Sequence, residues 1–244
     1  MTHNPTALIT GASRGLGLAL ARDLAEDGWH LVVDARNAPP LRAAAEELSR
    51  LTIVHALAGD VTDPAHRADL AAAASAEGGL DLVVLNASTL GLSPMPAVLD
   101  HPVDVLRRIY EVNTIAPLAL TQLALPKLRA SAGAVVNITS DAAVEAYEGW
   151  GGYGSSKAAL EHAFAVVAEE HPELRIYRID PGEMRTQMYQ ESAPGEDISD
   201  LPPPETSVPG LRALLAGDLP SGRYLAREVP LPVPAATVPE EASR

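Results

Sequence analysis

Short apolar runs alternate with longer amphipathic segments along most of the chain. Runs rich in β-prone residues fall at 7–10, 30–36, 52–57, 81–86, 135–140, 174–179 and 222–226, and we expect each of them to be a strand. Apolar residues at helical spacing follow at about 16–28, 41–50, 64–77, 103–128, 153–170 and 208–216. Strand and helix thus alternate about six times, which predicts an α/β fold. The expected architecture is a doubly wound parallel sheet of about seven strands, with helices on both faces and right-handed crossovers.

The pattern also suggests how the chain is divided. With 244 residues and 47% hydrophobic content, it is long enough to bury a large core, and one domain over residues 1–229 is the simplest expectation. Residues 183–205 are polar and broken by prolines, so we expect a lid at about 183–216. Residues 230–244 are rich in proline without periodicity, which predicts a loosely ordered tail.

Composition narrows the classes of function. The chain has 32 acidic and 18 basic residues and a formal net charge of -14, which opposes binding to nucleic acid or to an anionic membrane. There is no cysteine, and the seven histidines show no HxH or HExxH spacing, so we expect no metal site. No signal-like segment or membrane-length apolar run occurs, which predicts a cytoplasmic protein.

A glycine-rich turn follows the first predicted strand. Gly11, Gly15 and Gly17 have the spacing G-x-x-x-G-x-G, which lets the backbone approach a ligand and presents a helix N-terminus to a pyrophosphate. The alternative is a glycine-capped turn without a ligand. The same residues also fit the G-x-S-x-G elbow of α/β-hydrolases. Only ten residues precede the turn, however, and they leave no room for the upstream strands and oxyanion loop that a hydrolase needs.

The end of the second predicted strand bears on cofactor choice. In dinucleotide folds an acid here binds the ribose 2′-hydroxyl, whereas an Arg accommodates a 2′-phosphate. Arg36, together with Arg14 in the glycine turn, favours NADP(H). A register shift of one residue would place Asp34 there instead and favour NAD(H). Arg36 could also be a solvated surface charge.

The segment from 135 to 157 offers candidate acid–base chemistry. Tyr153 and Lys157 are four apart on a predicted helix, so they share one face, and the ammonium should lower the pKa of the phenol. Tyr153 would then be a general acid/base, and Ser140, at the preceding strand end, could hydrogen-bond a substrate oxygen. The alternative is an exposed helix face. Asn113, in the middle of the helix at 103–128, either is an exposed bystander or holds a water or a backbone group.

Chemically informative residues repeatedly follow strand ends. The glycine turn, Arg36, Asp60, Asn86, Ser140 and Pro181 all do so. Because the carboxyl ends of parallel strands meet at one edge of a sheet, where ligands bind at the switch point, we expect these residues to gather in one site.

Taken in order, these motifs resemble a known family. The sequence has Thr10-Gly11-x-x-x-Gly15-x-Gly17, Asp60, Asn86, Asn113, Ser140, Tyr153-x-x-x-Lys157 and Pro181-Gly182. Over residues 5–227 it resembles the single-domain, Rossmann-fold type of the short-chain dehydrogenase/reductase family. The resemblance implies that Tyr153 is the catalytic acid/base and that Ser140 positions the substrate oxygen. Lys157 would lower the tyrosine pKa and hold the nicotinamide ribose, and Asn113 would hold a relay water.

The resemblance further implies direct hydride transfer between a nicotinamide cofactor and a carbonyl or secondary alcohol. It implies adenine contacts by Asp60 and Val61, and contacts on the nicotinamide side by Pro181, Gly182 and Thr186. The complete set of expected cofactor contacts is Gly11, Ser13, Arg14, Gly15, Leu16, Gly17, Arg36, Asp60, Val61, Asn86, Ala87, Tyr153, Lys157, Pro181, Gly182 and Thr186. A homodimer or homotetramer would pair through the helices that contain Asn113 and Tyr153. The alternative is a cofactor-binding member with a non-redox or regulatory role, such as an isomerase, a dehydratase-like enzyme or a nucleotide sensor.

Two departures from the family pattern stand out. Where the family usually reads Asn-Asn-Ala-Gly, this chain has Leu85-Asn86-Ala87-Ser88, so the loop could sit differently against the cofactor. The final strand also lacks the usual glycine-rich ending. The substrate pocket should draw on residues 88–92, 141–150 and 183–189. Glu145, Tyr147, Glu148 and Trp150 either make that pocket polar and partly acidic, which favours a hydroxylated or amine-bearing carbonyl compound, or are solvated.

Overall fold

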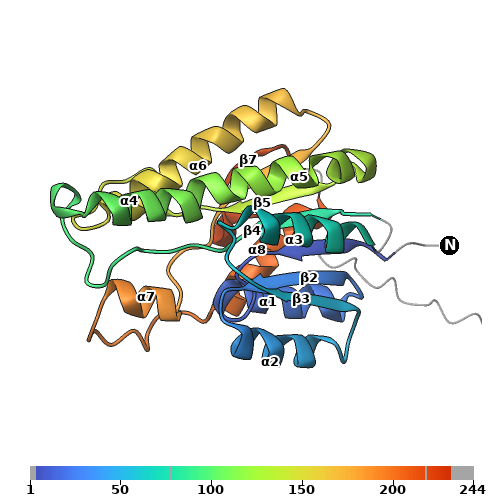
Figure 1. Ribbon diagram of the computed structural model, residues 1–244, viewed down its shortest axis with the longest axis horizontal. Coiled ribbons are helices and arrows are strands. Elements are labelled where there is room, and N and C mark those ends of the chain that lie inside the picture. The colour runs from blue at the N-terminus through green and yellow to red at the C-terminus, as the bar shows by residue number, and fades with distance from the viewer. Residues whose placement is uncertain (1–3, 77–78, 218, 232–244) are drawn as a thin grey trace, which may run out of the picture.

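A parallel sheet is the central layer of the protein (Figure 1). The computed structural model describes residues 4–76, 79–217 and 219–231. Within them, seven strands pair in the order β3-β2-β1-β4-β5-β6-β7. The strands are β1 Thr6–Ile9, β2 His30–Ala35, β3 Val54–Ala58, β4 Leu82–Leu85, β5 Ala134–Ile138, β6 Arg175–Asp180 and β7 Gly222–Leu225. The predicted doubly wound sheet is confirmed. Most of the predicted tail, from residue 232 on, lies outside the described residues.

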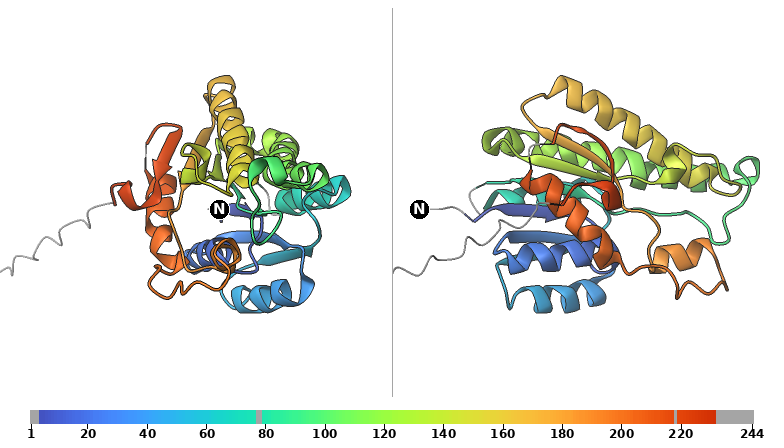
Figure 2. Two further views of the ribbon diagram at one scale, coloured as in Figure 1. Left: turned by 90° about the vertical axis from the view of Figure 1, so that its left-hand side faces the viewer. Right: turned by 180° about the vertical axis from the view of Figure 1, so that it is seen from behind.

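Helices cover both faces of the sheet (Figures 1 and 2). The α-helices are α1 Gly15–Glu26, α2 Ala38–Leu48, α3 Pro64–Ala76, α4 Val103–Tyr110, α5 Ala116–Ser131, α6 Gly151–Glu170, α7 Gln187–Ser192 and α8 Val208–Ala216. Residues of α1, α2 and α8 pack in one core with Ile9, Val33 and Val84. Residues of α3, α5 and α6 pack in a second core with Leu8 and Val83. Adjacent strand residues thus enter opposite cores, because side chains alternate along a strand.

Two predicted helices differ in detail from the structure. We expected one helix over 103–128, but α4 and α5 are joined by a π-helical turn, Glu111–Ile115, and Asn113 lies within that wider turn. The second helix, expected from about residue 41, begins at Ala38, so that Pro39 and Pro40 lie in the first turn of α2. A proline is tolerated there because the N–H groups of the first turn have no intrahelical partner.

The segment predicted to be a lid contains regular structure. It holds α7 and a 3₁₀ turn, Pro204–Ser207, and Arg185 N donates to the Pro202 carbonyl at 2.8 Å. In Figure 1, α7 projects beyond the carboxyl ends of the strands. The segment therefore overhangs the sheet edge, and movement of this lid remains a prediction.

Candidate functional site

One large cavity lies at the carboxyl edge of the sheet. Its volume is about 1080 Å³. It lies at the ends of the neighbouring strands β1 and β4. The chain continues from β1 to β2 on one side of this pair and from β4 to β5 on the other side, so this is the switch point of the sheet. Most of the predicted site residues line it: Gly11, Ser13, Arg14, Gly15, Leu16, Arg36, Asp60, Val61, Asn86, Ala87, Ser140, Tyr153, Lys157, Pro181, Gly182 and Thr186. The predicted convergence at one sheet edge is therefore found, with Gly17 and Asn113 outside the lining.

The glycine turn is packed tightly against the end of β4. Gly11 has a φ of 68°, in the region that favours glycine. The amide nitrogen Nδ2 of Asn86 donates to the carbonyls of Thr10 at 2.8 Å and Gly11 at 3.1 Å. A Cβ on Gly17 would lie 2.6 Å from that nitrogen. Gly17 is thus required by packing, and Asn86 holds the turn in place.

Asp34 faces into the protein as well as bordering the cavity. Its side chain is 1% exposed; Oδ1 accepts from Gly11 N at 2.8 Å, and Oδ2 lies 3.1 Å from Nε2 of His66 on α3. Both carboxylate oxygens therefore have partners within the chain. His66 is a residue that the sequence analysis missed, because nothing local to α3 reveals its partner on β2.

The Asp34–His66 pair predicts a pH dependence of stability. The hydrogen bond that His66 makes to the Asp34 carboxylate raises the pKa of His66 above its ordinary value, against the effect of burial. Stabilisation by the charged pair is then complete below the unfolded-state pKa of about 6.5 and is lost as the pH rises through the folded-state pKa. We expect His66→Gln to lower the free energy of unfolding more at about pH 6 than at about pH 9. Urea denaturation at both pH values measures this, and a cost that grew with pH would contradict it.

Arg14, Arg36 and Asp60 border the part of the cavity between β1 and β3. The Arg14 guanidinium donates to Oε1 of Gln187 on α7, which joins the glycine turn to the segment overhanging it. Asp60 is paired with Arg108 of α4, and its Oδ1 accepts from Thr62 N at 2.9 Å. Arg108 was also missed by the sequence analysis, since it is far from Asp60 in the chain. No partner is recorded for the Arg36 guanidinium among the described residues.

Tyr153 and Lys157 lie together on α6, as their spacing predicts. The Lys157 Nζ is 5.7 Å from the centre of the Tyr153 ring and donates to the Ile138 carbonyl at 2.7 Å. Both side chains are buried, with 8% and 2% exposed. The hydroxyls of Ser140 and Ser88 are close enough to the Tyr153 phenol to lower its pKa. They donate hydrogen bonds to Oδ1 of Asp141 at 2.9 Å and to Oδ1 of Asn113 at 3.1 Å.

The expected lowering of the tyrosine pKa is not found. Burial raises the pKa of Tyr153 above its ordinary value, and the nearby hydroxyls of Ser140 and Ser88 oppose this only partly. Burial also lowers the pKa of Lys157 to about 8. Desolvation thus dominates the electrostatics of both groups. The sequence shows the spacing of the two side chains but not the extent to which they are desolvated in the folded protein.

Asn113 is held from three sides beneath the cavity. It is 1% exposed, so it is not an exposed bystander. Its Nδ2 donates to the Thr89 carbonyl at 2.9 Å and to Ser156 Oγ at 3.0 Å. Its Oδ1 accepts from Thr89 N at 2.9 Å and from Ser88 Oγ at 3.1 Å. Asn113 therefore fixes the loop after β4 to α6, the helix that carries Tyr153.

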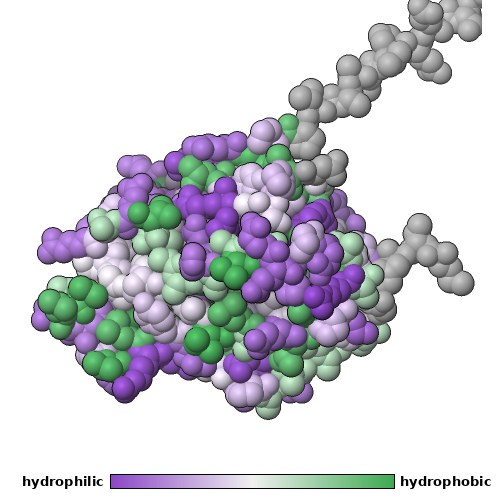
Figure 3. Space-filling model, turned by 90° about the horizontal axis from the view of Figure 1, so that it is seen from above, coloured by the Kyte–Doolittle hydropathy of each residue, from purple (hydrophilic) through white to green (hydrophobic). Residues whose placement is uncertain are grey.

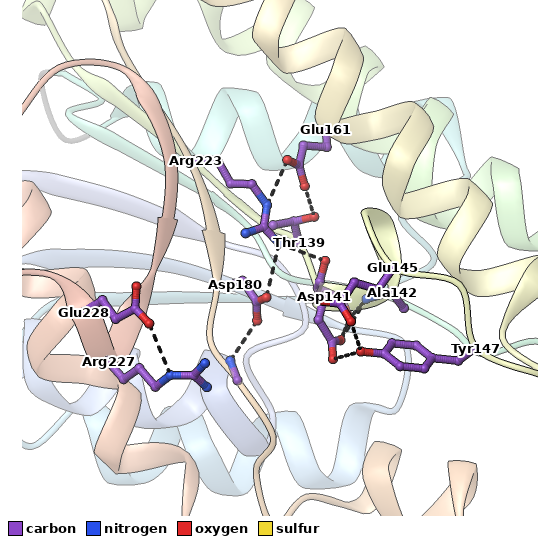
Figure 4. Close-up of polar contacts among 12 residues, drawn as sticks. Thr139, Asp141, Ala142, Glu145, Tyr147, Glu161, Asp180, Arg223, Arg227 and Glu228 are labelled. Carbon is purple, nitrogen blue, oxygen red and sulfur yellow. Dashed lines mark hydrogen bonds and ion pairs between the residues drawn. The ribbon is translucent and has the colours of Figure 1, made fainter.

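A largely buried ionic network joins Arg223, Glu161 and Asp180 (Figure 4). Arg223 of β7 reaches Glu161 of α6 at 3.0 Å and Asp180 of β6 at 3.2 Å, and it donates to the Ser140 carbonyl at 3.3 Å. Glu161 in turn accepts from the Thr139 hydroxyl at 2.7 Å. Arg223 thus connects the two strand ends and the helix that carry Ser140, Pro181 and Tyr153. The sequence analysis missed it, because β7 has no recognisable motif there.

The outer wall of the cavity is acidic. The Tyr147 hydroxyl lies between Oδ2 of Asp141 at 3.1 Å and Oε2 of Glu145 at 2.9 Å (Figure 4). The Tyr189 hydroxyl donates to Glu183 at 2.9 Å. Asp141, Tyr147, Glu183 and Tyr189 line the cavity. Of the four residues considered for this wall, Tyr147 and Trp150 line the cavity, whereas Glu145 and Glu148 are exposed and lie outside its lining. The acidic side chains of the lining are instead Asp141 and Glu183.

Neither a metal-binding cluster nor a membrane-spanning helix is found in the described part of the chain. Among residues 4–76, 79–217 and 219–231, no group of three or more His, Asp or Glu side chains could hold a metal ion. Within the same ranges, no helix combines the length and apolarity needed to cross a membrane.

Comparisons with known proteins agree with this geometry. The family "short chain dehydrogenase" matches residues 5–197. Benzil reductase ((S)-benzoin forming) of Saccharomyces cerevisiae is 34% identical over 195 residues, which are 75% of this chain and 73% of that protein. Serine 3-dehydrogenase of Agrobacterium fabrum is 34% identical over 186 residues, covering 75% and 73%. The structure of a short chain dehydrogenase from Shigella flexneri complexed with NADP superposes with a TM-score of 0.85 at 28% identity, covering 92% of this chain and 98% of that one.

Proposed function

The chain belongs to the short chain dehydrogenase family of oxidoreductases, and from that premise we propose that it transfers hydride between NADP(H) and a carbonyl compound or secondary alcohol. One observation carries the proposal. Tyr153, with Ser140 and Lys157, lines the same cavity as the glycine turn at the switch point of the sheet. This arrangement supports a site at which a dinucleotide and a small substrate meet, with Tyr153 as the proton donor.

The raised pKa of Tyr153 suits the reductive direction. A phenol that burial keeps protonated is the acid form that carbonyl reduction needs. Ser140 donates a hydrogen bond to the substrate oxygen, on which negative charge develops, and Tyr153 gives that oxygen its proton. When bound, the cofactor supplies the hydride, and its oxidised, positively charged ring favours the phenolate needed for the reverse reaction. Lys157 adds a second positive charge near the phenol.

The direct test is NADPH consumption with a panel of carbonyl compounds. Because the outer wall carries Asp141 and Glu183, we expect neutral or amine-bearing ketones and aldehydes to be reduced, and matched keto acids to have kcat/KM values at least about tenfold lower. The relatives named for benzil and serine suggest a diketone for this panel and, for the reverse assay with NADP⁺, an amino-hydroxy compound. The absence of turnover with every member, despite cofactor binding, would favour the non-redox alternative.

We propose that Arg36 binds the 2′-phosphate of NADP(H). Both Asp34 oxygens have partners within the chain, whereas Arg36 lines the cavity at the end of β2. We expect Arg36→Ala to weaken NADPH binding by about 10- to 100-fold, the loss of one charge-assisted contact, and to leave NADH binding within about twofold. Titration of nicotinamide fluorescence measures both affinities. Arg42→Ala, on the outer side of α2 and outside the cavity lining, is the matched control. Equal weakening of NADH and NADPH binding would contradict the assignment.

We also propose a homodimer formed through α4, α5 and α6. Seen from above, these helices present hydrophobic side chains among hydrophilic ones (Figure 3). Ile115 is 48%, Leu123 45% and Val166 42% exposed, which leaves apolar surface that a second copy would cover. Light scattering of the protein should give twice the mass of one chain, and Leu123→Glu should shift it toward the monomer. A monomeric parent protein would contradict the proposal.

A further inference from the structure

Ser88 occupies the position at which this family usually has glycine. It follows β4 directly after Asn86 and Ala87, and it lines the cavity. A glycine has no side chain to offer, so any contact of the Ser88 hydroxyl is an addition that this chain makes to the site. Serine in place of glycine at position 88 therefore adds a hydroxyl to the site, besides any effect on the conformation of the loop.

The Ser88 hydroxyl lies between two functional side chains. It donates to Oδ1 of Asn113 at 3.1 Å, and Asn113 is joined to the backbone of Tyr153 through the Ser156 hydroxyl. The Ser88 hydroxyl is also close enough to the Tyr153 phenol to lower its pKa. The backbone that carries it is fixed on both sides: Ala87 N donates to Thr10 Oγ1 at 3.0 Å, and Thr89 N donates to Asn113 Oδ1 at 2.9 Å. Ser88 is thus held against the phenol by the same contacts that fix the loop.

This placement makes the hydroxyl a donor that can switch partners. While Tyr153 is protonated, the Ser88 O–H donates to Asn113. Once Tyr153 is a phenolate it needs donors, and the Ser88 O–H can rotate toward it. Asn113 Oδ1 remains satisfied, because it keeps the N–H of Thr89. The rotation therefore leaves no buried acceptor without a partner.

We propose that Ser88 is a further catalytic residue, whose hydroxyl stabilises the phenolate of Tyr153 alongside Ser140. In the reductive direction the O–H bond of Tyr153 breaks and the O–H bond of the product alcohol forms. Ser88 gains or loses no proton; it changes the acceptor of its hydrogen bond from Asn113 to the phenolate. The proposal rests on the proposed function, because it assigns Ser88 to the acid–base step of that reaction.

The first test does not depend on turnover. A fluorinated tyrosine at position 153 lowers the intrinsic pKa of the phenol, so that its ionisation can be followed by absorbance while the protein is folded. In that background, Ser88→Gly and Ser88→Ala are expected to raise the midpoint by about one pKa unit, the loss of one hydrogen bond to a charged group. Ser88→Thr keeps the hydroxyl and should restore the parent midpoint. An unchanged midpoint in both Gly and Ala variants would overturn the proposal.

The second test is kinetic. With the natural Tyr153, Ser88→Gly should lower kcat about tenfold, shift its pH profile to higher pH, and leave NADPH affinity unchanged. Ser155→Ala removes a hydroxyl on α6 that bonds to the Gly151 carbonyl at 2.5 Å, outside the cavity lining, and should change none of these. A kcat for Ser88→Gly equal to that of the parent protein would overturn the catalytic role of Ser88. A parent protein without any turnover would contradict the proposed function instead, and the titration would still decide on the hydrogen bond.

Discussion

Replacing Tyr153 with Phe should lower kcat for carbonyl reduction by about a hundredfold to ten-thousandfold, the range spanned by the loss of a positioned general acid. The ring remains to fill the buried space beside Trp150, whose centre is 5.7 Å away, so folding should be preserved. Only the proton donor of the cavity is lost. NADPH affinity is expected to stay within about threefold of the parent value, because a single neutral hydrogen bond contributes little to it. Steady-state kinetics and a fluorescence titration measure the two effects separately.

A matched control is available on β7. Tyr224→Phe removes a phenol hydroxyl that donates to the Pro220 carbonyl at 2.7 Å and that lies outside the cavity lining. It should leave kcat within about twofold of the parent value. Full turnover by Tyr153→Phe would rule out the acid–base role. Loss of NADPH binding equal to the loss of kcat would show that the phenol acts on binding rather than on chemistry.

Removing the Arg223 guanidinium should produce the largest loss of stability among the substitutions considered. Its partners Glu161 and Asp180 have side chains only 10% and 6% exposed, and Arg223→Ala would leave both carboxylates without their cation. Breaking a fully buried pair costs about 3–5 kcal/mol. Because Arg223 itself is 25% exposed, we expect a smaller loss of about 2–4 kcal/mol in the free energy of unfolding. The midpoint of thermal unfolding should fall by roughly 5–15 °C.

Two further variants separate pairing from packing. Adding Glu161→Gln to Arg223→Ala removes one of the two unpaired charges and should recover part of the lost stability. Arg227→Ala removes an arginine that is 71% exposed and 3.8 Å from Glu228, and it should change the free energy of unfolding by no more than about 0.5 kcal/mol. Urea unfolding measures all three variants. Equal costs for Arg223→Ala and Arg227→Ala would contradict the buried network.

The fold and the gathering of the site could be predicted from local patterns. Buried parallel strands have continuous apolar runs, and their carboxyl ends meet at one edge; Ser140 and Tyr153 could therefore be placed together although a loop separates them. Pairings between distant segments could not be predicted. His66 meets Asp34, and Arg223 meets Glu161, only through the packing of helices on the sheet. Nothing in the local sequence around these residues specifies their partners.

Burial was the second property that the sequence did not reveal. Lys157, four residues after Tyr153, suggested a lowered phenol pKa, whereas desolvation of Tyr153 raises it. The π-helical turn around Asn113 was missed for a related reason. The apolar spacing across residues 103–128 fits an uninterrupted helix, and the widening of the turn appears only where Asn113 bonds to Thr89 and Ser156. Such turns often mark functional positions.

The central claim is that hydride moves directly from the cofactor to a carbonyl carbon. It can be tested by supplying NADPH that carries deuterium at the nicotinamide C4 to the protein, with whichever carbonyl compound of the panel is reduced fastest. The account predicts that the product alcohol carries one deuterium on the former carbonyl carbon, transferred from one face of the nicotinamide ring only, in ordinary water. A product without deuterium, or conversion of the compound without NADPH consumption, would contradict hydride transfer and point to the isomerase or dehydratase-like alternative.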